Sequence, residues 1–131
     1  MKKVLMVAMD FPPCKSAGVQ RTLKFVEFLP EHGWSPCVLT GVPLIYDELS
    51  EVALPDFLKV YRAFGLNTFK HLAFKGKHFE SMAKPDRYST WYWHGVIKGM
   101  QAIRETRPQV IWSTFPCSTS HRIAATLRRK T

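Results

Sequence analysis

Two short stretches carry the residue types from which an anion-binding site is built. The first runs from Ala17 and Gly18 to Arg21, after an apolar segment and a proline-rich loop. Small residues at a helix start leave backbone N–H groups accessible, and these groups with the positive helix end bind phosphate. The second stretch contains Ser118 and His121, which open the last helical segment. If the protein handles a phosphate-bearing molecule, we expect one edge of its site at the first stretch; the second stretch follows a strand, where ligand contacts are also expected.

Simpler explanations compete at both stretches. A tight turn that needs glycine for its backbone angles explains Gly18 equally well. A lone histidine such as His121 is more often structural or solvated than part of a site. Both alternatives stay open at the level of the sequence.

The first loop lacks the glycines of the two common phosphate-binding signatures. GxGxxG needs three glycines and GxxxxGKS needs two, whereas this loop has Lys15, Ser16 and the single Gly18. A dinucleotide-binding Rossmann domain and a P-loop NTPase are therefore not expected. The sequence shows no metal-ligand spacing, and the acidic stretch 44–55, with Asp47, Glu48 and Glu51, predicts a solvated loop or short helix.

Cysteines and aromatic residues add little chemistry. Cys14, Cys37 and Cys117 are odd in number and far apart, so we expect free thiols rather than a disulfide framework. The aromatic residues within 88–93 could stack on sugar rings or bases, but packing is the favoured interpretation.

Alternating strands and helices must position these residues. The apolar run 4–9 does not alternate with polar residues, which is typical of a strand covered on both faces. Helical spacing predicts a helix from Gly18 to His32-Gly33, and with a strand over 36–40 this makes a βαβ unit. Further elements are expected at 57–62 (strand), 89–107 (helix), 109–114 (strand) and from 118 onward (helix, capped by Ser118 or Thr119). The expected fold class is α/β, a Rossmann-like three-layer domain with a mainly parallel sheet.

Charge is distributed unevenly along the 131 residues. Residues 1–60 hold six Lys/Arg and seven Asp/Glu, a net charge of −1, whereas residues 61–131 hold thirteen and three, a net of +10. A one-sided basic half indicates a polyanionic partner, which could be nucleic acid, acidic lipid or a phosphorylated substrate. Charge alone does not choose among them.

Residues 66–83 form a basic amphipathic stretch. Such a helix can lie on an anionic membrane surface, although a helix packed on the domain with a solvated polar side is the favoured alternative. The residues that would make peripheral membrane contact are Leu66, Phe69, Lys70, Phe74, Lys75 and Lys77. The apolar start of the chain is too short for a secretory signal, so we expect a cytoplasmic protein, at the inner membrane face if this stretch binds lipid.

The order and spacing of several motifs resemble the N-terminal domain of GT-B glycosyltransferases, in particular the retaining family often labelled group 1. The motifs are the first strand with Asp10-Phe11-Pro12-Pro13, the pair Ala17-Gly18, Arg21, Pro85-Asp86-Arg87, and Arg107-Pro108-Gln109-Val110-Ile111-Trp112-Ser113-Thr114-Phe115-Pro116 with the Ser/Thr-His segment that follows. Family members usually carry two small residues, often Gly-Gly, where this chain has Ala17-Gly18.

The resemblance implies a two-domain enzyme that transfers a sugar from a nucleotide-sugar to an acceptor in the cleft between its domains. Residues 1–131 correspond to the acceptor-side Rossmann-like domain, and the C-terminal nucleotide-sugar domain is absent, so we expect this chain alone to be inactive and to be part of something longer. The resemblance implies an enzyme without a cofactor or a metal. Its acceptor would be lipid-linked or a polysaccharide, and nucleic acid is not an expected partner. The resemblance does not identify a catalytic residue. The residues implied in donor-diphosphate or acceptor binding are Ala17, Gly18, Arg21, Arg87, Ser118 and His121. A stand-alone basic module that binds anionic lipid or nucleic acid remains the alternative.

Overall fold

The computed structural model describes residues 1–15, 18–45, 52–65, 90–115 and 117–131. The predictions for Ala17, Arg87 and the stretch 66–83 lie outside these residues. The elements in chain order are β1 (Lys2–Val7), α1 (Gly18–Phe28), the 3-10 turn η1 (Leu29–His32), β2 (Trp34–Gly41), the 3-10 turn η2 (Pro43–Ile45), β3 (Lys59–Ala63), α2 (Trp91–Thr106), β4 (Val110–Ser113) and α3 (Ser118–Lys130).

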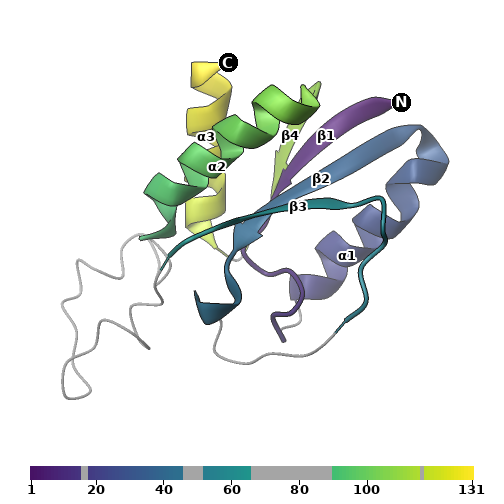
Figure 1. Ribbon diagram of the computed structural model, residues 1–131, viewed down its shortest axis with the longest axis horizontal. Coiled ribbons are helices and arrows are strands. Elements are labelled where there is room, and N and C mark those ends of the chain that lie inside the picture. Colours follow the sequence, from purple (N-terminus) through teal and green to yellow (C-terminus); the bar gives the residue numbers. More distant parts are fainter. Residues whose placement is uncertain (16–17, 46–51, 66–89, 116) are drawn as a thin grey trace.

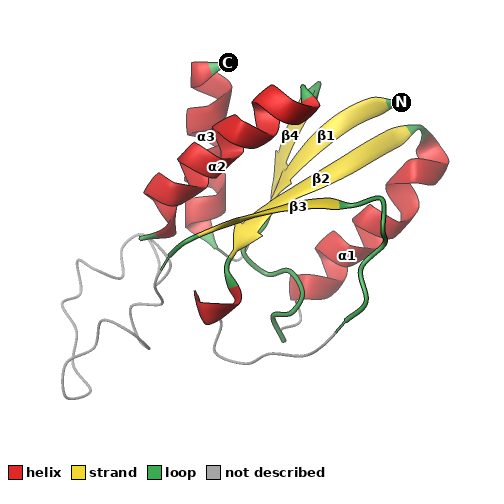
Figure 2. Ribbon diagram, in the orientation of Figure 1, coloured by secondary structure: helices red, strands yellow, loops and turns green. Residues whose placement is uncertain are grey.

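The four strands form one parallel sheet in the order β3-β2-β1-β4. The helix α1 covers one face, and α2 and α3 lie side by side on the other (Figures 1 and 2). The connection from β1 to β2 moves toward one edge of the sheet, and the connection from β3 to β4 moves toward the other edge. Because such crossovers are right-handed, the connecting helices α1 and α2 lie on opposite faces of the sheet. The predicted α/β, Rossmann-like class with three layers is confirmed.

The central strand β1 is buried on both faces. Leu5 and Val7 belong to the core beneath α2 and α3, whereas Val4 and Met6 belong to the smaller core beneath α1. Successive side chains of a strand point to opposite faces, so a strand covered twice needs apolar residues at every position. This explains the unbroken apolar run at the start of the chain.

Several predicted boundaries differ from the observed ones by a few residues. The strand predicted over 4–9 begins at Lys2, because the first two lysines already pair with Trp34 and Ser35 of β2. The first helix gives way at Phe28 to the turn η1, which contains Pro30 and ends at Gly33 with φ of 83°. Proline lacks the N–H that would continue an α-helix, and glycine accepts the left-handed conformation.

The cap predicted for the last helix was also wrong. Ser118 is the first helical residue, and the N-cap position is taken by Cys117, whose side chain makes no capping hydrogen bond. The aromatic prediction holds only in part, because Trp91 is fully buried whereas Trp93 is 72% exposed. All three cysteines are free thiols. Within the described residues, no helix combines the length and apolarity needed to cross a membrane.

The contact between α2 and α3 depends on two glycines one helical turn apart. A Cβ added at Gly95 would lie 2.5 Å from Ile123 Cδ1, and one added at Gly99 would lie 2.5 Å from Leu127 Cδ1. Both partner side chains are fully buried. The glycines therefore let α3 approach α2 closely and fix its position over β1 and β4.

Candidate functional site

The sheet has a topological switch point between β1 and β4. These two strands are neighbours, yet the helices that follow them, α1 and α3, pack on opposite faces of the sheet (Figure 1). The loops after the two strands therefore diverge at the carboxyl ends of β1 and β4. In open α/β sheets, ligands bind in the crevice that such diverging loops create.

Arg21 spans this point. Its Nη1 donates to Thr114 Oγ1 at 2.8 Å and to the backbone oxygen of Phe115 at 3.2 Å. Arg21 lies in the first turn of α1, and Thr114 follows β4 on the side of the sheet that α1 covers. The predicted site residue Arg21 thus joins the start of the first helix to the loop after the fourth strand. Thr114 was not singled out by the sequence, because a threonine after a strand carries no signal of its own.

Gly18 is the first residue of α1, and the carboxylate of Asp10 lies against it. A Cβ built on Gly18 would be 2.5 Å from Asp10 Oδ2, so only glycine admits this approach. The N-terminal end of a helix carries a partial positive charge that favours a negatively charged group. The role of Gly18 in anion binding stays a prediction, and in this structure an acidic side chain of the chain itself lies beside it.

The other two predicted residues, Ser118 and His121, lie on the opposite face of the sheet, and His121 bonds to Ser113, which was not predicted as a site residue. Ser113 Oγ and His121 Nδ1 are 2.7 Å apart, and they join the end of β4 to the first turns of α3. Because side chains alternate along a strand, Thr114 faces α1 while Ser113 faces α3. The structure thus brings His121 to the carboxyl end of β4, as the sequence predicted, but does not bring it to Arg21. Ser118, partly buried, lies at the start of the same helix.

Two further contacts hold the loop after β1 in place. Arg62 of β3 donates to the backbone oxygens of Gly41, at 2.9 Å, and of Pro12, at 2.5 Å. Thr40 Oγ1 donates to the backbone oxygen of Met9 at 3.1 Å. The loop that carries Asp10 is therefore tied to β2 and β3. Sequence reasoning missed Arg62, because the contact joins segments about fifty residues apart.

The pKa values of Tyr61, Glu105 and Cys37 are shifted, and these residues lie where α2 packs on β2 and β3. Burial, followed by the hydrogen bond to Glu105, raises the pKa of Tyr61, whose hydroxyl donates to Glu105 Oε2 at 2.6 Å. The same bond is the main cause of the lowered pKa of Glu105. Burial raises the pKa of the Cys37 thiol. These groups serve the packing of α2 on β2 and β3.

In the part of the chain that the structure describes, no three His, Cys, Asp or Glu side chains gather as a metal-binding group would. Comparison of the chain with protein-family models, with curated proteins and with solved structures gave no match. The functional interpretation therefore depends on the geometry at the switch point and on the motifs of the sequence.

Proposed function

We propose that this chain is the acceptor-side domain of a retaining GT-B glycosyltransferase of the group 1 type. In that proposal the whole enzyme moves a sugar from a nucleotide-sugar to a lipid-linked or polysaccharide acceptor. The single observation that supports it best is the contact of Arg21 with Thr114 across the switch point, next to the glycine start of α1. A donor diphosphate at this point would meet backbone N–H groups and a cation together.

Arg21 and Gly18 supply the donors that sugar transfer needs. When the bond to the sugar breaks, negative charge grows on the departing nucleoside diphosphate, and preorganised N–H groups and cations stabilise it. A guanidinium carries five N–H donors, and Nη1 makes the two protein contacts given above. Arg21 can therefore hold the loop after β4 and bind an anion at the same time.

Asp10 gives the site a built-in competitor for the diphosphate. Its carboxylate and a phosphate cannot share the start of α1, because like charges at that distance repel strongly. Binding of the diphosphate therefore requires Asp10 to move away from Gly18. Asp10 then becomes available to accept a hydrogen bond from a hydroxyl of the sugar or of the acceptor.

His121 and Ser118 are proposed to contact the acceptor. His121 is exposed, and with Nδ1 bonded to Ser113 its Nε2 remains the ring nitrogen that can meet a sugar hydroxyl. Phe115, whose backbone oxygen accepts from Arg21, has an exposed side chain that offers a ring on which a sugar could stack. The proposed roles of Ala17 and Arg87, and membrane contact through 66–83 at the cytoplasmic face, fall on residues that the structure does not describe.

A second candidate function is a basic module that binds anionic lipid or nucleic acid. The observation in its favour is α3, which carries Arg122, Arg128, Arg129 and Lys130 and no acidic residue. Part of this charge is used in packing, because the guanidinium of Arg122 lies 4.7 Å from the centre of the Tyr92 ring.

Titration calorimetry separates the two functions. The chain is titrated with UDP and GDP and with a series of nucleotide-sugars, and in parallel with a short DNA duplex and vesicles containing anionic lipid, each at low and high salt. The glycosyltransferase proposal expects nucleoside diphosphates to bind weakly, because only the diphosphate side of the site lies in this chain, and Gly18→Val to remove that binding. Binding of DNA or vesicles that falls steeply with salt, with no response to any nucleotide, would establish the basic module instead.

A further inference from the structure

The outer side of α2 carries two exposed apolar side chains. Trp93 and Ile97, one helical turn apart, are 72% and 66% exposed. Arg104, seven residues after Ile97, lies on the same side of the helix and is exposed as well. The buried residues of α2, among them Trp91 and Gly95, lie on the other side and face the core, so this stripe points away from the sheet.

Tyr92 joins the stripe to α3. Its ring meets that of Trp93 edge to face, with 5.0 Å between the ring centres, and the guanidinium of Arg122 lies 4.7 Å from its own centre. The Tyr92 hydroxyl lies 2.7 Å from Thr126 Oγ1, which also accepts from Nη2 of Arg129 at 3.2 Å. The two arginines of α3 therefore border the apolar side chains of α2, where the two helices lie side by side (Figure 1).

These side chains form one surface with an excess of positive charge. We call it the α2–α3 surface, and its residues are Trp93, Ile97, Arg104, Arg122 and Arg129. The two helices together hold six Lys/Arg and one acidic residue, Glu105. Glu105 lies on the side of α2 next to β3, where its carboxylate accepts from Tyr61 at 2.6 Å. No carboxylate of these two helices therefore offsets the charge of the surface.

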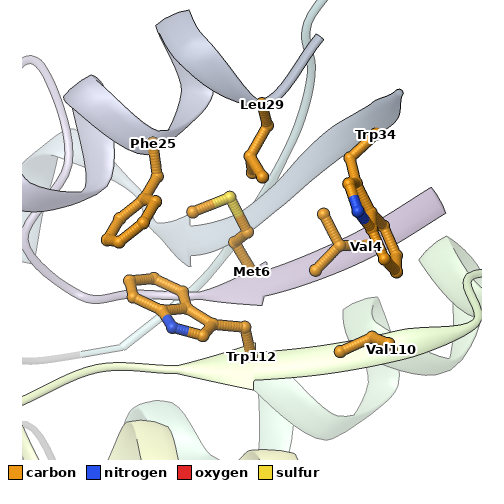
Figure 3. Close-up of a pocket in the computed structure, with 7 residues that line it drawn as sticks. All are labelled: Val4, Met6, Phe25, Leu29, Trp34, Val110 and Trp112. Carbon is orange, nitrogen blue, oxygen red and sulfur yellow. The ribbon is translucent and has the colours of Figure 1, made fainter. Parts of the chain in front are cut away.

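The α1 face of the sheet has a different character. α1 and η1 hold two Lys/Arg and two glutamates, so their charges balance. Phe25 and Phe28 of α1 are half-exposed, and Phe25 packs on Trp112 where both rings line an apolar pocket of about 210 Å³ (Figure 3). Exposed apolar side chains thus occur on both faces of the sheet, but an excess of positive charge accompanies them on the α2–α3 surface.

We propose that the α2–α3 surface lies on an anionic phospholipid membrane. Trp93 and Ile97 enter the boundary between the headgroups and the acyl chains, where a tryptophan ring is in an apolar environment and its N–H still finds a partner. The three arginines at the border of the surface meet the lipid phosphates. α2 then lies along the plane of the membrane.

Other occupants fit this surface less well. A nucleic acid would neutralise the arginines, but its phosphate backbone offers no apolar environment for the exposed side chain of Ile97. A second copy would bring like charges together, which opposes association. The membrane contact does not depend on the proposed sugar transfer, and it involves other residues than the stretch 66–83.

Sedimentation with vesicles tests the proposal on the whole chain. We expect binding to vesicles of phosphatidylglycerol and phosphatidylcholine in equal parts, weaker binding at high salt, and little binding to phosphatidylcholine alone. Lipids brominated on the acyl chains quench tryptophan fluorescence that reaches them. Trp93→Phe should bind like the native chain but lose most of this quenching, because Trp91 is fully buried and Trp34 and Trp112 are half-buried.

Two pairs of variants separate this surface from the rest of the molecule. Replacing Trp93 and Ile97 together by serine should weaken vesicle binding by about tenfold, whereas Phe28→Ser, which removes an exposed ring on the α1 face, should leave it unchanged. Arg104→Glu should also weaken binding by about tenfold, while Lys24→Glu makes the same charge change on α1 and should have little effect. All of these side chains are exposed, and circular dichroism checks that the fold is retained.

Several results would overturn the proposal. Equal effects within each pair of variants would show attraction by net charge without a defined surface. Loss of binding when Lys70, Lys75 and Lys77 are changed to glutamate, with no effect of the α2 variants, would place the contact in the stretch 66–83. A DNA duplex that competes with the vesicles, with no quenching by brominated lipid, would make nucleic acid the partner. None of these readouts involves a nucleotide-sugar, so failure here is distinguishable from failure of the proposed function.

Discussion

The guanidinium of Arg21 and the hydroxyl of Thr114, 93 residues apart in the chain, are joined by a hydrogen bond of 2.8 Å. This bond ties the first turn of α1 to the loop after β4 at the one place where the two helices leave the sheet on opposite faces. It therefore positions a cation at the switch point before any ligand is present. Preorganisation of this kind is what stabilises developing charge in a transition state.

Removal of the acceptor in this bond is the first prediction. Thr114→Val keeps the shape of the side chain but deletes Oγ1, and we expect the free energy of unfolding to fall by about 0.5–1.5 kcal/mol. Urea unfolding of Thr114→Val, of Arg21→Met and of the double variant gives the coupling between the two side chains. If the two single effects simply add, the bond does not hold the site together.

Gly18→Val is the second prediction. The new side chain would displace the carboxylate of Asp10, since even a Cβ lies 2.5 Å from Oδ2, and it would also cover the helix start. We expect nucleotide binding by this chain, and sugar transfer by the complete enzyme, to be lost while the circular dichroism spectrum is retained. Asp10→Asn is the matched control, because it lowers the negative charge at the helix start and should strengthen diphosphate binding. Unchanged turnover in Gly18→Val would remove Gly18 from the site.

The pH dependence of stability tests the pair Tyr61 and Glu105. The pKa of Glu105 is lowered in the folded state, so its contribution is present above the ordinary glutamate value of about 4.3 and is lost as the pH falls through the folded pKa. The pKa of Tyr61 is raised, so its contribution is present below about 10 and is lost at higher pH. Tyr61→Phe should therefore be less stable at neutral pH, and its difference from the native chain should shrink in acid. If the stability difference between Tyr61→Phe and the native chain were the same at every pH, the hydrogen bond between Tyr61 and Glu105 would not contribute to the pH dependence of stability.

The two glycines of α2 give a matched comparison. At Gly99 a new Cβ would meet three atoms of Leu127 within 3.2 Å, whereas at Gly95 only the tip of Ile123 is closer than 3.0 Å. Overpacking in a filled core costs about 1–3 kcal/mol, while alanine gains about 1 kcal/mol over glycine in a helix. Gly99→Ala should therefore lower the melting temperature and Gly95→Ala should change it little. Equal effects of the two substitutions would mean that α3 shifts freely on α2.

The sequence predicted the parallel α/β sheet because the apolar run 4–9 is unbroken, as in a strand covered on both faces, and is followed by residues at helical spacing. It did not predict that Lys2 and Lys3 belong to the strand, since backbone pairing with β2 does not depend on side-chain polarity. The positions of Gly18, Arg21 and His121 could be predicted in part, because all three follow strands that end at one edge of the sheet. The contacts that position them, from Thr114, Ser113, Arg62 and Asp10, join distant segments and leave no local signal.

The most direct test of the proposed function is an amide NMR titration of the chain with nucleoside diphosphates. The proposal predicts that one of them shifts the amide signals of Gly18, Val19 and Thr114, with smaller changes at the opposite ends of the strands, and that Arg21→Met suppresses these shifts. Signals that move only on the basic face of α3, or that do not move with any nucleotide at millimolar concentration, would contradict a diphosphate site at the switch point.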